Sequence, residues 1–198
     1  MTRFVIIALL AAVLLPSLAM AGLSPHTRDG WSASVSYGGA RGEATFADGR
    51  NGEAEDGVSP QMRLSRMVTD RVAVGVAYTG WMYEIGELPI KYRYTSQQIM
   101  AAATWYPRGG GFYVRGGVGL GWMSEVEVEI LADEEQGHGD RETDTGPGIE
   151  LNVGYEFRVA RAMAVGMGVG YNHQFMDGHV YESAFSVPVT LNLAWYWD

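Results

Sequence analysis

The sequence predicts an all-β fold, an eight-stranded antiparallel up-and-down transmembrane β-barrel preceded by a cleaved signal peptide. Three observations predict it. Apolar residues alternate with small or polar ones along successive segments from Trp31 onward in the 198-residue chain, which is typical of strands with one apolar face. Residues 1–21 have the pattern of an export signal. Short and long connections alternate, as they do in outer-membrane barrels.

The export signal comes first along the chain. Arg3 provides a positive start, residues 4–15 are apolar, and Ala19-Met20-Ala21 is a small-residue cleavage site. The apolar run is too short for a membrane-spanning helix, which needs about 20 residues. We therefore expect a signal peptide over 1–21 and a single barrel domain over 22–198.

The first four strands are predicted over residues 31–40, 58–68, 71–83 and 92–106. In each of them a run of alternate residues is apolar and is assigned to the lipid-facing side. Three connections separate these strands: a polar loop over 41–57, a tight turn at Thr69-Asp70 and a loop over 86–90. The outward residues include Trp31, Val35, Tyr37, Met62, Leu64, Val72, Val74, Val76, Tyr78, Ile99, Ala101, Ala103 and Trp105.

The last four strands are predicted over residues 111–128, 146–159, 162–174 and 185–197. A glycine-rich turn at 107–110, a long acidic loop over 130–145, a turn at Ala160-Arg161 and a loop around Asp177-Gly178 precede them in that order. The final strand alternates most clearly. Its outward residues are Phe185, Val187, Val189, Leu191, Leu193, Trp195 and Trp197. An even strand number places both ends of the barrel domain on the side of the short turns, the periplasm.

The composition excludes some classes of function. The formal net charge is −9 and Lys91 is the only lysine, so a nucleic-acid partner is not expected. The chain has no cysteine. A closed barrel in lipid stabilises such a domain without disulfides, because neighbouring strands pair all backbone groups. No cofactor and no metal site is predicted.

Five charged residues are predicted to face the lumen and form a charge network. They are Arg63, Arg115, Glu150, Glu156 and Arg158. Buried charges must pair, and Arg115 with Glu156 is the direct pair that we favour, since their strands are neighbours. The preferred interpretation is a structural plug. The alternative is an ion gate, in which the charged residues exchange partners and so open a narrow path through the lumen.

Five outward aromatic residues are predicted to form a girdle near the turn ends of the strands. They are Trp105, Phe112, Phe157, Trp195 and Trp197. Aromatic side chains of this kind anchor barrels at the membrane–water interface. A second set, which includes Tyr78, Trp122, Tyr171 and Phe185, is expected towards the loop ends.

Two further features of the sequence are candidate sites. The acidic loop contains Asp133, Glu134, Glu135, Asp140, Glu142 and Asp144; a solvated loop is preferred over a divalent-cation site, since no calcium-loop spacing is present. His173 and Ser183 flank the last loop with the same outward parity. No orienting carboxylate shares that parity, so no catalytic residue is predicted.

The sequence resembles the small outer-membrane β-barrel proteins of Gram-negative bacteria, loosely called the porin family, which are similar in architecture to the barrel of outer membrane protein A. The resemblance lies in residues 105–107 leading into 111–119, in residues 69–74 and in the ending over 191–197. It implies location in the outer membrane, contact with lipid and lipopolysaccharide, insertion by the barrel-assembly machinery, and a monomer. The implied role is non-enzymatic, either envelope integrity or surface contact. A narrow channel, an adhesin and a lipid A-modifying enzyme are the alternatives.

Overall fold

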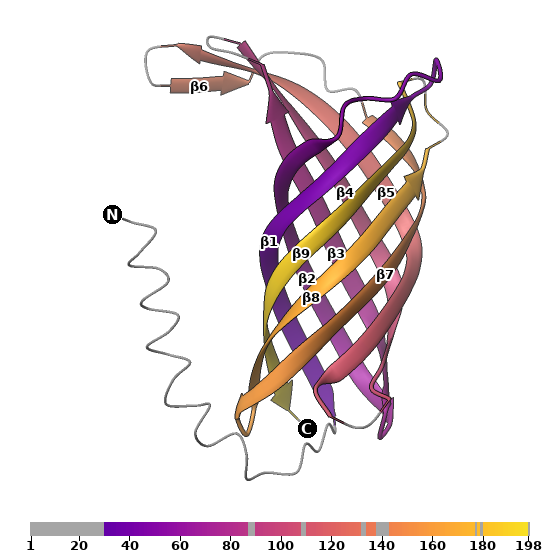
Figure 1. The fold of residues 1–198 in the computed structure, drawn as a ribbon, viewed down its shortest axis with the longest axis vertical. Coiled ribbons are helices and arrows are strands. Elements are labelled where there is room, and N and C mark those ends of the chain that lie inside the picture. Colours follow the sequence, from indigo (N-terminus) through magenta and orange to yellow (C-terminus); the bar gives the residue numbers. More distant parts are fainter. Residues whose placement is uncertain are drawn as a thin grey trace.

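The protein is an all-β barrel in a computed structural model, which describes residues 30–86, 90–107, 110–131, 134–137, 143–176, 178 and 180–197 (Figure 1). The predicted signal peptide lies outside the described residues. The strands are β1 (Trp31–Phe46), β2 (Glu55–Thr69), β3 (Val72–Ile85), β4 (Ile90–Trp105), β5 (Phe112–Leu131), β6 (Glu134–Gly137), β7 (Thr143–Ala160), β8 (Met163–Phe175) and β9 (Tyr181–Trp197).

Eight of these strands close into a ring. Each of the eight pairs antiparallel with its neighbours in the chain, β6 aside, and β1 closes the ring by pairing with β9 from Trp31 opposite Trp197 to Phe46 opposite Tyr181. A closed ring leaves no unpaired strand edge. The predicted fold class of an eight-stranded antiparallel up-and-down barrel is therefore confirmed.

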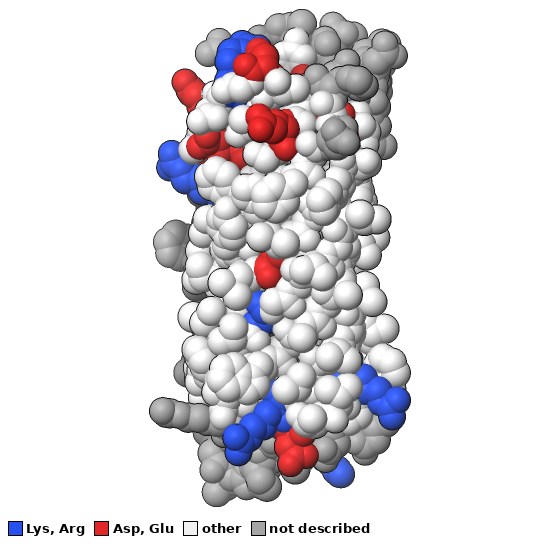
Figure 2. Space-filling model, turned by 90° about the vertical axis from the view of Figure 1, so that its right-hand side faces the viewer, with Lys and Arg blue, Asp and Glu red and all other residues white. Residues whose placement is uncertain are grey.

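The two faces of the wall follow the predicted alternation. Outward apolar side chains such as Val76, Val118 and Leu191 are more than half exposed, while inward residues such as Ala73 and Ala77 are almost fully buried. Figure 2 shows the result: most charged side chains lie at the two ends, and the broad band between them is uncharged apart from one acidic and one basic group near its middle. An exposed apolar surface of this extent requires lipid, so the barrel is a membrane-spanning one.

The strands are longer than predicted at one end of the barrel. We call this the loop end, and the opposite end, with the connections β2–β3, β4–β5 and β7–β8, the turn end. β1 continues to Phe46 and β2 begins at Glu55, so 41–46 and 55–57 of the predicted loop over 41–57 are strand and residues 47–54 form the connection. Gly49 in that connection has a φ of 79°, and the Arg50 backbone N–H donates to Asp48 Oδ1 at 3.0 Å, which lowers the pKa of Asp48.

The predicted long acidic loop over 130–145 is also partly wrong. β5 continues to Leu131 and pairs with β6 before β7 begins at Thr143. Figure 1 shows β6 at the loop end, extending sideways beyond the barrel wall. A barrel strand needs about 9–11 residues to cross a membrane, whereas β5 has 20. The loop end therefore projects from the membrane as a continuation of the sheet.

The closed ring predicts a specific behaviour on gels. Because no edge is available from which the hydrogen-bonded ring can open, folded protein should stay folded in SDS at room temperature. Samples with and without boiling should then run at different positions in SDS electrophoresis. Identical mobility, or recovery of the folded protein from the soluble periplasm, would contradict a membrane barrel.

Candidate functional site

Two buried ion pairs occupy the lumen. Arg63 on β2 reaches across to Glu156 on β7, with 3.2 Å between Nη2 and Oε1, and the Tyr196 hydroxyl donates to the other oxygen of Glu156 at 2.5 Å. Arg115 on β5 donates from Nε to Oε1 of Glu150 on β7 at 2.7 Å. The four charged residues are at most 6% exposed, so the structure brings together four of the five predicted lumen charges.

The lumen charges balance within this group. Two guanidinium groups face two carboxylates, which is the arrangement that a poorly hydrated interior demands. Polar and aromatic side chains surround the two pairs. Arg115 Nη2 also donates to Gln61 Oε1 at 3.2 Å, and the Arg63 guanidinium lies 5.9 Å from the centre of the Tyr113 ring. Gly154 and Gly168 make room for that ring, since a Cβ at either position would clash with the Tyr113 hydroxyl.

The predicted direct pair between Arg115 and Glu156 is wrong. In the register of β5 with β7, Arg115 lies opposite Asn152, and Glu150 lies opposite Gly117, two residues away. Glu156 lies four residues from Asn152 along β7, about 13 Å for extended chain. The fact that two strands are neighbours is therefore not enough to predict which of their inward side chains pair. The register places Arg115 beside Glu150 and leaves Glu156 to Arg63, which comes from the opposite wall.

Arg158, the fifth predicted network residue, lies at the turn end and is half-buried. Its guanidinium carbon is 3.9 Å from the centre of the Tyr196 ring, and Nη1 donates to the Arg161 carbonyl oxygen at 2.7 Å. Because Tyr196 itself donates to Glu156, Arg158 adjoins the network through this tyrosine and lies beside the turn between β7 and β8.

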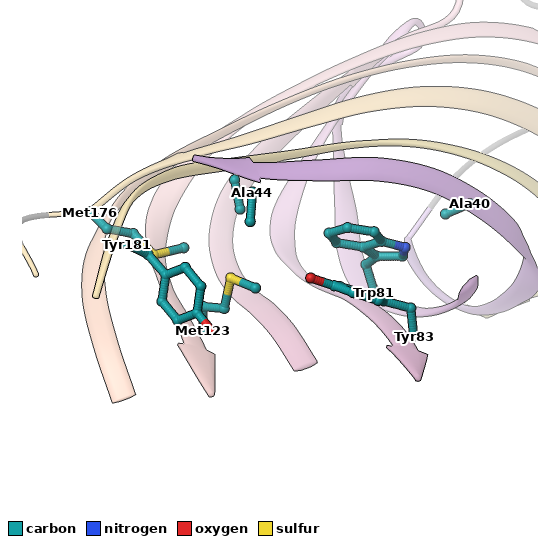
Figure 3. Packing of buried hydrophobic residues seen from close by; sticks show 8 residues of the cluster. Ala40, Ala44, Trp81, Tyr83, Met123, Met176 and Tyr181 are labelled. Carbon is teal, nitrogen blue, oxygen red and sulfur yellow. The ribbon is translucent and has the colours of Figure 1, made fainter. Parts of the chain in front are cut away.

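A cluster of aromatic and methionine side chains fills the lumen towards the loop end. Figure 3 shows Trp81 and Tyr83 of β3 on one side and Met123 and Tyr181, from β5 and β9, on the other. Trp81 stacks on Tyr83 with 4.4 Å between ring centres, and Tyr83 stacks on Tyr94 at 4.9 Å. This cluster was not predicted from the sequence. The signal was present, because Trp81 and Tyr83 have the same inward parity as Ala77 and Thr79.

Two carboxylates hold the aromatic cluster in place. Glu125 accepts hydrogen bonds from the hydroxyls of Tyr94 at 3.2 Å and Tyr181 at 3.1 Å. Asp144, assigned to the acidic loop by sequence, is instead a buried residue of β7, and its Oδ2 accepts the backbone N–H groups of Val180 and Tyr181. These bonds anchor the start of β9 over the lumen. Of the other acidic-loop residues, Asp133, Asp140 and Glu142 lie outside the described residues.

The predicted girdle residues all lie on the outer wall near the turn end. They are Trp105, Phe112, Phe157, Trp195 and Trp197, each between 37% and 52% exposed. Trp31 lies in the same zone, directly opposite Trp197. Their position is where aromatic side chains meet the headgroup region of a bilayer, and their role as a girdle stays a prediction.

The register does not place His173 and Ser183 directly opposite each other. His173 lies opposite Phe185, whereas Ser183 lies opposite Phe175, and His173 Nδ1 is 2.9 Å from the Tyr171 hydroxyl. Among the described residues, no group of three or more His, Cys, Asp or Glu side chains is arranged to hold a metal ion. No helix in that same part of the chain is long and apolar enough to cross a membrane.

Comparisons with known proteins agree with this architecture. No protein-family model matches the sequence, and no curated protein matches it. Among solved structures, Ail, the attachment invasion locus protein of Yersinia pestis, matches with a TM-score of 0.52 and 12% identity over 85% of this chain and 99% of Ail. Neisserial surface protein A matches with a TM-score of 0.54 and 15% identity over 85% of this chain and 98% of that one. The chain is thus an eight-stranded β-barrel with the fold of bacterial outer-membrane proteins.

Proposed function

We propose that this protein is a non-enzymatic outer-membrane barrel that acts through its loop end and keeps its lumen closed. One observation supports this most directly. The two ion pairs and the aromatic cluster occupy the lumen at successive levels, with Arg63, Arg115, Glu150, Glu156 and Trp81 each nearly inaccessible. A barrel of eight strands encloses only enough space for side chains. Its role is then envelope integrity or surface contact, with lipid and lipopolysaccharide around a monomer inserted by the barrel-assembly machinery.

Conductance in planar lipid bilayers tests the closed lumen. We expect the wild-type protein to give no discrete current steps. Glu150→Ala should also stay silent, because the aromatic cluster of Trp81, Tyr83, Met123 and Tyr181 closes the lumen independently of the charges. The triple variant Glu150→Ala, Glu156→Ala and Trp81→Ala breaks both ion pairs and removes the largest side chain of the aromatic cluster, and it is the variant in which steps are expected. Steady steps from the wild-type protein would favour the alternative of a narrow channel, and steps from Glu150→Ala alone would favour a charge gate.

The loop end is the part of the barrel that is available for contact with a partner at the cell surface. The β5–β6 extension lies beyond the barrel wall (Figure 1). Ail has also been solved in complex with the heparin analogue sucrose octasulfate, and that structure is similar to this chain with a TM-score of 0.53 and 14% identity. It is an example of a small barrel with a bound ligand. The described loop end of this chain is mainly acidic, with Asp48, Glu53, Asp56, Glu84 and Glu182 exposed. A polyanion is therefore not the expected partner here, and a cationic surface fits better.

Orientation is the prediction on which surface contact depends. An epitope inserted within residues 138–142, between β6 and β7, should be accessible to antibody on intact cells, because the loop end is the end that faces outward in such barrels. The same epitope inserted at 108–109, on the turn side, should react only after the outer membrane is opened. The reverse labelling pattern would contradict the proposal, since the acidic end would then face the periplasm.

A further inference from the structure

Arg66 is an unusual residue of the outer wall. It faces outward near the turn end of β2 and is exposed, while Leu64 and Val68, the nearest residues of the same face, are exposed apolar side chains. Its direct neighbours across the sheet are Trp31 on β1 and Val74 on β3. A charged guanidinium thus lies within a surface that is otherwise made for lipid.

The other outward arginines on described barrel strands have a carboxylate opposite them. Arg41 lies opposite Asp56, with 4.0 Å between Nη1 and Oδ1, and Arg93 lies opposite Glu84, with 2.7 Å between Nη2 and Oε1. Both pairs are at the loop end. Within the described part of the chain, Arg66 has no carboxylate at either cross-strand position. A cation at a membrane surface is stabilised by an anion, and neither described cross-strand partner of Arg66, Trp31 or Val74, supplies one.

Two tryptophans define the surroundings of Arg66. Its guanidinium carbon lies 5.7 Å from the centre of the Trp31 ring. Trp31 in turn lies opposite Trp197 of β9, and both indoles are exposed on the outer wall. Directly opposed side chains in an antiparallel pair have Cβ atoms about 5 Å apart. Arg66, Trp31 and Trp197 therefore form one continuous row across three strands, which we call the Arg66 row.

We propose that the Arg66 row binds an anionic phospholipid in the leaflet at the turn end of the barrel. The planar guanidinium donates to the phosphate oxygens, a match of charge and geometry that arginine makes better than lysine. The indoles of Trp31 and Trp197 cover the glycerol region, where interfacial tryptophans reside. Leu64 and Val68 lie along the acyl chain. The lipid phosphate is the anion that a membrane surface offers at this level, and this inference does not depend on what the loop end contacts.

Native mass spectrometry of the folded, delipidated barrel tests the proposal. Protein in a nonionic detergent is titrated with dioleoylphosphatidylglycerol and, separately, with dioleoylglycerol, which has the same chains without the phosphate. We expect the phospholipid to be retained about tenfold more strongly, as for a hydrogen bond to a charged group. Equal retention of the two lipids by the wild-type protein would overturn the proposal without recourse to any variant.

Three variants locate the effect. Arg66→Gln should lower retention of phosphatidylglycerol about tenfold, to the level of dioleoylglycerol, whereas Arg66→Lys should keep part of the difference. Arg41→Gln is the matched control, an outward arginine on the neighbouring strand whose charge is already paired, and it should change nothing. Loss of retention in Arg41→Gln equal to that in Arg66→Gln would overturn the assignment to the Arg66 row. Displacement of the lipid by excess inorganic phosphate would show a free-phosphate site and overturn the lipid site.

Discussion

Glu150→Ala should destabilise the barrel by about 3–5 kcal/mol, because it leaves the Arg115 guanidinium buried without its carboxylate. Arg115 is 5% exposed, and its one further side-chain hydrogen bond among the described residues is to the uncharged Gln61. Reversible unfolding in urea, followed by tryptophan fluorescence in lipid vesicles, measures the free energy of unfolding. Arg115→Ala should be costly for the same reason.

The double variant distinguishes pairing from independent effects. Arg115→Ala with Glu150→Ala should lose clearly less than the sum of the single losses, with a coupling of about 1–3 kcal/mol. Arg115→Ala with Glu156→Ala is the matched control. Each residue there belongs to a different pair, so the losses should add to within about 0.5 kcal/mol. Coupling between Arg115→Ala and Glu156→Ala, together with additive losses for Arg115→Ala and Glu150→Ala, would restore the pairing of Arg115 with Glu156. That result would refute the register of β5 and β7.

Val153→Arg should cost about 2–4 kcal/mol and reduce insertion, because it places a charge in the middle of the lipid-facing wall. Val153 lies mid-strand on β7, opposite Val114 and Val169, and its side chain is exposed outward. Refolding into vesicles, measured as the fraction that shows the heat-dependent gel shift, gives yield and stability together.

Thr143→Arg is the matched control for Val153→Arg. Thr143 is on the same strand with the same outward parity, but it begins β7 at the loop end and lies opposite Ser124. A charge near or beyond the interface costs at most about 1 kcal/mol. If Thr143→Arg proved as damaging as Val153→Arg, the apolar wall would not be the part of the barrel that faces lipid.

Much of the fold is encoded locally and was therefore predictable from the residues. Alternation in β9 and β8 assigns each side chain to the wall or the lumen, because successive side chains on a strand point to opposite faces. Arg63, Arg115, Glu150 and Glu156 are all inward as that parity predicts. The same parity applied to Trp81 and Tyr83 would have predicted the aromatic cluster.

The extent of the strands at the loop end was not predictable from alternation alone. Residues 41–46 and 134–137 have the pattern of a polar loop, yet they form the end of β1 and the whole of β6. Their pairing partners stabilise them, Val187 opposite Arg41 and Val128 opposite Gly137 for example. Beyond the membrane no lipid requires an apolar face, so strands there do not show the pattern by which they are recognised.

By itself the sequence determined that the chain is an eight-stranded barrel, which side chains line the lumen and which face lipid, since each follows from a period of two along a single strand. Only the tertiary structure decided which lumen charges meet. Arg115 pairs with Glu150 because of the register of β5 on β7, and Arg63 meets Glu156 because closure of the ring brings opposite walls within reach. Closure also left Arg66 opposite Trp31 and Val74. Register and closure depend on all the strands together, and no single strand encodes them.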